Sequence, residues 1–195
     1  QPIAITDPLG CLTRFEYDHR GKPTAQVDAL GHVTSYRYDG DGRLVSVTDA
    51  KGGVQQIRYD GAGRLKSVTD CSGYPTSYDY DCASRVSAVI DALDQSVKYT
   101  YDPLGNTTSV CQPDGSREQF RYDADGRMTV YTDAAGYETR YRYNGHGFPV
   151  ERVDALGHSV QYLYNTLLQL TELINANGES YYFTYEVEGR ISSET

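Results

Sequence analysis

Tyrosine recurs along the chain at every 21st position, with no insertion or deletion. The nine members of this column are Tyr17, Tyr38, Tyr59, Tyr80, Tyr101, Tyr122, Tyr143, Tyr164 and Tyr185. A second column of bulky apolar side chains lies two positions earlier in each repeat, for example Phe15, Tyr36 and Ile57. Residues two apart share one face of a strand, so each pair predicts a short strand with a ring-bearing face. We expect the rings of successive hairpins to stack on one another, so that both columns are structural.

Two Asp-x-x-Gly steps punctuate most repeats. One follows the tyrosine, as with Asp39 and Gly42, and the other follows the next apolar run, as with Asp49 and Gly52. Asp at the first position and Gly at the fourth favour a type I turn that continues into a left-handed glycine and closes a hairpin. Three positions lack this glycine, and there we expect looser or differently shaped turns: Ser84, Asp94 and Leu168.

The second strand of each repeat has a less regular pattern than the first. Leu44 and Val47, for example, are three positions apart, which does not fit one face of a regular strand. A β-bulge between them would explain the spacing, and so would a sheet that is partly covered on both sides. The sequence leaves both explanations open.

Together these patterns predict an all-β fold, an antiparallel hairpin meander of nine 21-residue repeats with two strands each. We expect residues 1–195 to form a single array that is a segment of a longer repeat protein. Open sheets rarely exceed about ten strands without curling, because strand twist accumulates. The meander is therefore expected to curl into a spiral or a partial β-shell.

Composition narrows the possible partners. The chain has 27 acidic and 18 basic residues, a net charge of −9, which argues against nucleic acid or an anionic membrane surface as a partner. No apolar run approaches the roughly 20 residues of a transmembrane helix, so we expect no membrane insertion. With Tyr and Gly at 19 residues each and no Trp, the composition favours strands and turns.

Within this regular 21-residue spacing, several repeats also share a characteristic run of residues. The string Tyr38-Asp39-Gly40-Asp41-Gly42-Arg43-Leu44, followed by Asp49-Ala50-Lys51-Gly52, resembles the YD repeat of the Rhs (rearrangement hot spot) proteins. It is also similar to the repeats of insecticidal toxin complexes and teneurins. The resemblance covers essentially the whole chain, with departures at Asn144, Asn165 and Glu186, where Asp is replaced.

The resemblance implies a shell. In Rhs proteins YD repeats wind into a hollow β-structure, and the bacterial shells enclose a C-terminal toxin that is released by self-cleavage and often delivered by a type VI secretion system. For this chain it implies a structural, non-catalytic shell segment that encloses or carries a C-terminal toxin domain. The implied partners are further YD repeats and that toxin domain of the parent polypeptide. The implied location is secreted or at the cell surface.

An adhesive module built on the same repeats is the alternative function. Tyrosine-rich β surfaces can stack on sugars, so a secreted or cell-surface carbohydrate- or protein-binding role fits the composition. The residues that would bind a glycan lie outside the two ring columns. Tyr74 and Tyr137 are the chief candidates, because both directly follow a turn glycine and they lie three repeats apart.

We predict no catalytic residues, no metal site and no cofactor. Doubled aspartates occur in only two repeats, as Asp39 with Asp41 and Asp123 with Asp125, and solvated turns explain them better than calcium does. The four cysteines fall in different repeat phases without a C-x-x-C pair, which argues against zinc: Cys11, Cys71, Cys82 and Cys111. Free thiols are favoured over a bridge between Cys71 and Cys82, the alternative, for a protein that folds in a reducing cytosol.

One string near the start resembles the Rhs self-cleavage site, which has the form Pro-x4-Asp-Pro-x-Gly-Leu. Here Pro2 is followed by Asp7-Pro8-Leu9-Gly10. Pro2 is in phase with prolines of later repeats, and Asp7 is in phase with later turn aspartates. The repeat itself therefore explains the string, and we do not assign cleavage chemistry to it.

Overall fold

The computed structural model describes residues 3–186 and 189–194, and the chain divides into two compact units, Gln1–Ser96 and Val97–Thr195. The strands of the first unit are β1 (Ala4–Thr6), β2 (Leu12–Tyr17), β3 (Pro23–Val27), β4 (Val33–Tyr38), β5 (Leu44–Thr48), β6 (Val54–Tyr59), β7 (Leu65–Thr69), β8 (Pro75–Tyr80) and β9 (Val86–Ile90). Those of the second unit are β10 (Ser96–Tyr101), β11 (Thr107–Cys111), β12 (Arg117–Tyr122), β13 (Met128–Thr132), β14 (Glu138–Tyr143), β15 (Pro149–Val153), β16 (Ser159–Tyr164), β17 (Leu170–Ile174), β18 (Ser180–Tyr185) and β19 (Ile191–Glu194).

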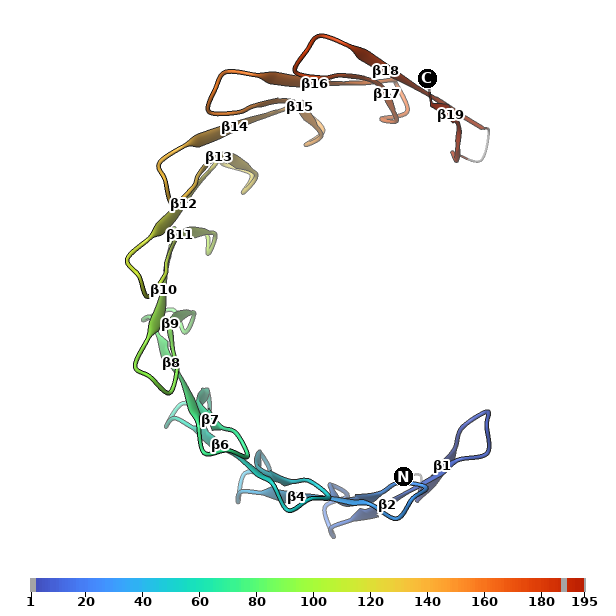
Figure 1. Cartoon of the computed structure of the whole chain (residues 1–195), viewed down its shortest axis with the longest axis vertical. Helices are drawn as coiled ribbons and strands as arrows, with labels where there is room; N and C mark the ends of the chain where they lie inside the picture. The colour runs from blue at the N-terminus through green and yellow to red at the C-terminus, as the bar shows by residue number, and fades with distance from the viewer. Residues whose placement is uncertain (1–2, 187–188, 195) are drawn as a thin grey trace. The chain divides into compact units, whose positions relative to one another are not determined.

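Each unit is an antiparallel meander. In the first, every strand from β1 to β8 pairs with the strand that follows it in the chain. The second unit repeats this from β10 to β19, and the chain-order succession of strands within a unit can be followed in Figure 1. The predicted all-β hairpin meander is confirmed. Among the described residues no helix is long and apolar enough to span a membrane.

Two kinds of turn alternate along the chain. We call those that follow the column tyrosines YD turns and those at the other end of the strands return turns. In the YD turn of residues 39–43, Asp39 N–H donates to the Arg43 carbonyl at 2.9 Å and Gly42 N–H donates to the Asp39 carbonyl at 3.0 Å. Gly42 has φ +80°, the left-handed conformation that glycine adopts without steric cost. Return turns such as residues 49–53 have the same two bonds.

The glycine-free turns correct one expectation. Ser84, Asp94 and Leu168 have φ of 60–63°, and each donates its N–H to the same carbonyl that a turn glycine would reach. These turns therefore have the ordinary shape and are not loose. The physical reason is that the acceptor side chain and the strand register already define the loop, so the fourth residue is held in the left-handed region even with a Cβ.

A β-bulge follows every YD turn and settles the spacing of the second strand. Arg37 is opposite Ser46, but Tyr38 is opposite Leu44, so Val45 is the extra residue. The shift brings Leu44 and Val47 onto the face that carries Tyr38 and Tyr36. The same shift occurs in all nine YD hairpins. Of the two explanations left open, the bulge is the one observed.

Side chains pack on the sheet without forming an enclosed core. Of the described residues only Ala25, Ala88 and Ser109 are buried, and all three occupy one repeat position. The column tyrosines are half-buried throughout. We call the face that carries them the ring face, and the face that carries Ala25, Ala88 and Ser109 the opposite face. Stability must therefore come from many partial contacts between neighbouring strands rather than from a few deeply buried groups.

Candidate functional site

The tyrosine column is tied to the backbone by its hydroxyl groups. Tyr59 donates its hydroxyl to the carbonyl of Leu44, 15 residues earlier, at 3.0 Å. Six further members make the same bond at 2.7–2.9 Å: Tyr38, Tyr80, Tyr122, Tyr143, Tyr164 and Tyr185. Each bond joins one repeat to the preceding one and gives the part-buried hydroxyl a protein partner.

The aspartate that follows the column tyrosine in six of the nine repeats organises the YD turn. Asp39 Oδ1 accepts the backbone N–H of Arg43 at 2.8 Å, while Oδ2 accepts the Arg43 Nε–H at 2.8 Å. Asp60 and Arg64 repeat this arrangement, with distances of 2.9 and 2.8 Å. In both turns the backbone bond from the arginine, together with its guanidinium, lowers the pKa of the aspartate carboxyl.

The same arginine also reaches the next repeat. The Arg43 guanidinium lies 5.0 Å from the ring centre of Tyr59, and Arg64 lies 4.5 Å from that of Tyr80. Both distances fall in the cation–π range. In the same way, Lys22 lies over Tyr38 at 5.1 Å and Arg127 lies over Tyr143 at 5.4 Å. The recurrent unit is thus an aspartate, an arginine and the tyrosine of the following repeat.

Sequence reasoning missed this arrangement. It predicted that rings of successive hairpins would pack on one another, but the close ring pairs found are few, such as Phe148 with Tyr164 at 5.3 Å between centroids. A signal was present in the sequence, because Arg43, Arg64 and Arg127 each stand five positions after a column tyrosine. An arginine at a fixed repeat position on a ring-bearing face indicates a stacking partner.

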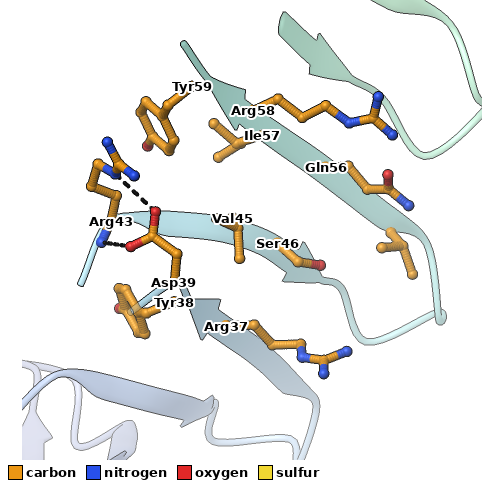
Figure 2. A pocket seen from close by; sticks show the side chains of 11 residues that line it. Arg37, Tyr38, Asp39, Arg43, Val45, Ser46, Gln56, Ile57, Arg58 and Tyr59 are labelled. Atoms are coloured by element: carbon orange, nitrogen blue, oxygen red, sulfur yellow. Dashed lines mark hydrogen bonds and ion pairs between the residues drawn. The ribbon is translucent and has the colours of Figure 1, made fainter. Parts of the chain in front are cut away.

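A hollow of about 650 Å³ lies against β4, β5 and β6. Its lining includes Arg37, Ser46, Val54, Gln56 and Arg58 on the opposite face, together with ring-face residues such as Tyr38, Ile57 and Tyr59. Figure 2 shows the arginines of β4 and β6 extending in the same direction, with Ser46 on the strand between them. On this face the middle strand contributes a short side chain, Ser46, between the longer Arg37 and Gln56 of its neighbours.

The two tyrosines predicted for glycan binding do not line this hollow. Tyr74 and Tyr137 end return turns, where their N–H groups donate to Asp70 and Asp133, and their exposures are 62% and 61%. Tyr137 lines a smaller hollow of about 350 Å³ that also includes Arg140. Their accessibility is compatible with stacking on a ligand, and their role stays a prediction.

The doubled aspartates, which were weighed as calcium ligands, are paired with arginines of their own turns. Asp41 and Asp125 pair with Arg43 and Arg127 at 2.9 and 2.7 Å, so each doubled aspartate shares an arginine. No group of three or more potential metal-ligating side chains occurs in the described part of the chain. The four cysteines are free thiols.

The string that resembles a cleavage site forms an ordinary return turn. Asp7 Oδ1 accepts the N–H groups of Leu9 and Cys11 at 2.9 and 2.8 Å. Its first residue, Pro2, lies outside the described residues. The carboxylate of Asp7 is therefore used as the turn acceptor, as it is in the other return turns.

Comparison with known proteins now identifies the repeat. A family model described as RHS Repeat matches residues 17–54, 59–96, 101–137 and 122–159, together more than half of the chain. The chain belongs to the RHS repeat family. Each match spans about two of the 21-residue units, so one RHS Repeat match corresponds to a pair of YD hairpins. No curated protein sequence matches the chain.

Solved structures resemble the RHS repeats described here in fold. A TcdB2-TccC3-Cdc42 crystal structure matches with a TM-score of 0.63 and 16% identity over 94% of this chain. A Photorhabdus luminescens Tc holotoxin pore with a TccC3-D651A mutation matches with a TM-score of 0.61 and 15% identity over 94% of this chain. A TcdB2-TccC3 crystal structure matches with a TM-score of 0.61 and 17% identity. This chain covers 13–14% of the length of those chains.

Proposed function

We propose that this chain forms part of the wall of an Rhs-type shell that encloses or carries a toxin domain of its own polypeptide. The observation that carries the proposal is the likeness in fold to the TcdB2-TccC3 structures over 94% of the chain, combined with membership of the RHS repeat family. One of the similar structures is described as a Tc holotoxin pore. A toxin protein secreted or displayed at the cell surface is the setting that this likeness supports.

The role we propose for the wall is structural and non-catalytic. The carboxylates of the YD turns support this view, because those of Asp39 and Asp60 are engaged by backbone N–H groups and arginines of their own turns. The proposed partners are further YD repeats and the toxin domain. Strand edges accept such repeats by backbone pairing, and β1 and β19 each pair with one neighbour among the described strands.

Limited proteolysis of the protein isolated from its source tests the proposal. We expect a product much larger than the 21.7 kDa of this chain, with more YD repeats and an unrelated C-terminal domain that resists protease while the shell is intact. The same domain expressed alone serves as the matched control and should be digested rapidly. A native chain of this size, or a C-terminal domain cut equally fast in both forms, contradicts enclosure.

A glycan-binding adhesive role is the second candidate, and the high exposure of Tyr74 and Tyr137 favours it. This alternative requires the 195-residue chain to bind glycans without further domains. Tyr74→Ala or Tyr137→Ala should then weaken binding on a glycan array while leaving the melting temperature unchanged. Phe in place of either tyrosine, which keeps the ring, is the control that should retain binding.

A further inference from the structure

An internal comparison points to an unassigned binding site on the opposite face of the first unit. Two rows of side chains cross the sheet at equivalent positions, five repeats apart. In the second unit the row is Arg142, Glu151 and Gln161, on β14, β15 and β16. In the first unit it is Arg37, Ser46 and Gln56, on β4, β5 and β6. The two rows differ only in the middle residue.

The second unit fills its row with its own carboxylate. Glu151 Oε2 accepts a hydrogen bond from Arg142 at 3.0 Å, and Glu151 Oε1 accepts one from the Ser159 hydroxyl at 3.1 Å. The glutamate side chain is 22% exposed, so it lies down on the sheet between its neighbours. The middle position of the row in the second unit therefore holds a carboxylate, which is bound by the arginine of the neighbouring strand.

The first unit lacks that carboxylate. Ser46 replaces the glutamate, and Val54, 40% exposed, stands where Ser159 stands in the second unit. In the part of the chain that the structure describes, no hydrogen bond or ion pair is formed by the side chain of Arg37 or of Arg58. Ser46 and the two arginines line one part of the hollow of about 650 Å³, and their side chains extend to the same side of the sheet (Figure 2).

We propose that this hollow binds a carboxylate-bearing peptide segment of a partner protein. One carboxylate takes the position that Glu151 occupies beside Arg142, with Arg37 as its donor and the methylene stem of the ligand against Val54. A second carboxylate pairs with Arg58, which belongs to the next repeat, about 12 Å away across two strand spacings and two residues along the strand. Arginine favours such recognition because its guanidinium presents a planar fork of donors.

Neighbouring charges limit what can bind. Arg37 and Arg58 occupy the same position of two successive repeats. That position holds Glu16 in the repeat before them and Asp79 in the repeat after them. Both are exposed. Carboxylates on either side of two cations disfavour a long polyanion such as a nucleic acid, which would meet repulsion at both ends. They leave room for a short segment with two acidic residues.

The test uses the full 195-residue chain and a synthetic probe, the peptide Gly-Glu-Gly-Gly-Glu-Gly with blocked ends. Its control replaces both glutamates by glutamines. Titration followed by NMR of the arginine Nε–H signals should give a dissociation constant of about 1 mM or below for the glutamate peptide. Raising the salt concentration should weaken that binding, because the paired groups are exposed.

Two variants remove the site in different ways. Replacing both cations (Arg37→Gln with Arg58→Gln) should weaken binding about five-fold or more, and so should Ser46→Glu, which supplies the internal carboxylate of the second unit. Arg142→Gln removes the same charge at the equivalent position, where a carboxylate is already present, and should leave the affinity unchanged. Arg37, Arg58 and Arg142 are exposed, so the thermal unfolding of the arginine variants should match that of the parent. Ser46 is half-buried, and Ser46→Glu is compared only after its circular dichroism spectrum has been matched to that of the parent.

Three results overturn the proposal. They are equal affinity for the glutamate and glutamine peptides, equal loss in Arg142→Gln and in the double variant, and tighter binding of a single-stranded oligonucleotide than of the peptide. The site stands independently of the shell. Proteolysis of the native protein and peptide binding by this chain are separate measurements, so either proposal can fail alone.

Discussion

Two YD turns, that of Asp60 in the first unit and that of Asn144 in the second, hold the next tyrosine with different side chains at one repeat position. In the Asp60 turn a cation lies over the ring, Arg64 over Tyr80, as Arg127 lies over Tyr143 in another turn of the second unit. In the Asn144 turn Phe148 takes that position and packs against Tyr164 at 5.3 Å. Yet the hydroxyl groups of Tyr80 and Tyr164 donate to backbone carbonyls at 2.7 and 2.8 Å in both cases.

The difference separates what the repeat requires from what it tolerates. The tyrosine hydroxyl bonds to the preceding repeat whether the repeat position 16 residues before the tyrosine holds a cation, a ring or an amide, since Tyr185 makes the same bond where that position is Gln169. The acceptor that closes the turn is likewise an aspartate carboxylate or an asparagine amide oxygen, as in Asn144 and Asn165. The backbone geometry is common to the turns of both units, whereas the charge of the turn side chains differs from one turn to another.

The largest expected effect comes from removing a column ring. Tyr80→Ala and Tyr164→Ala should each lower the local free energy of unfolding by about 2 kcal/mol, less than for a fully buried ring because both rings are half-buried. Tyr80→Phe and Tyr164→Phe remove only the hydroxyl and should each cost about 1 kcal/mol. Hydrogen exchange of the flanking strands measures these values. Unequal losses in the two Phe variants would break the idea of a shared hydroxyl anchor.

Turn conformation should produce the next largest effect, with opposite signs in the two units. Leu168 has φ +63°, so Leu168→Gly should stabilise its hairpin by about 1 kcal/mol. Gly63 has φ +81°, and Gly63→Ala should destabilise its hairpin by a similar amount, roughly 1 kcal/mol. Leu168→Ala is the matched control, since it shortens the side chain without relieving φ. Thermal melts check all three, and a stabilising Gly63→Ala would contradict the assignment.

The cation and the ring should differ in their response to salt. Arg64→Met keeps an apolar stem over Tyr80 but removes the charge, and should cost about 0.5 kcal/mol at low salt and less at high salt. Phe148→Met removes a ring contact of about 0.5 kcal/mol, with no dependence on salt. Melting temperatures at low and high salt concentration distinguish the two. Identical salt slopes would show that the Arg64 charge has no role in holding the tyrosine.

Acid should affect the first unit more than the asparagine turns of the second, and this is the smallest effect. The N–H and guanidinium of Arg64 lower the pKa of Asp60 below its ordinary value of 3.8. A folded-state pKa below the unfolded value gives a stabilisation that is present above about pH 4 and lost as the pH falls through the folded-state pKa. Asp60→Asn should therefore reduce the loss of protection on acidification, as followed by hydrogen exchange. An unchanged acid response would contradict the assignment.

Much of the fold could be predicted from the sequence because one short unit is repeated without interruption. The spacing of the column tyrosines gave the first strand of each repeat, and the paired turn residues gave the hairpins. The bulge was only one of two alternatives, since Leu44 and Val47 define a spacing but not the register of the opposing strand. Register depends on which backbone groups pair across the turn, and no single residue encodes it.

The site was less predictable. Arg37, Ser46 and Gln56 come from three strands, and their sequence positions carry no motif of their own. The 21-residue period already aligns them with Arg142, Glu151 and Gln161, but that the three residues form one row across the sheet is known only from the ladder register. The turn at Leu168 was expected to be looser or differently shaped, because the lack of glycine was considered without the hydrogen bonds that hold the loop.

The tyrosine anchors have a consequence for how genes of this kind can change length. The hydroxyls of Tyr59 and Tyr80 reach carbonyls of the preceding repeat, and the guanidinium groups of Arg43 and Arg64 reach a ring of the following one. Unequal recombination that removes or duplicates one whole repeat gives every anchor an equivalent partner, so the product folds without compensating substitutions. Any other length offsets the anchors at the junction. Natural variation in the length of this protein should therefore accumulate in whole repeats.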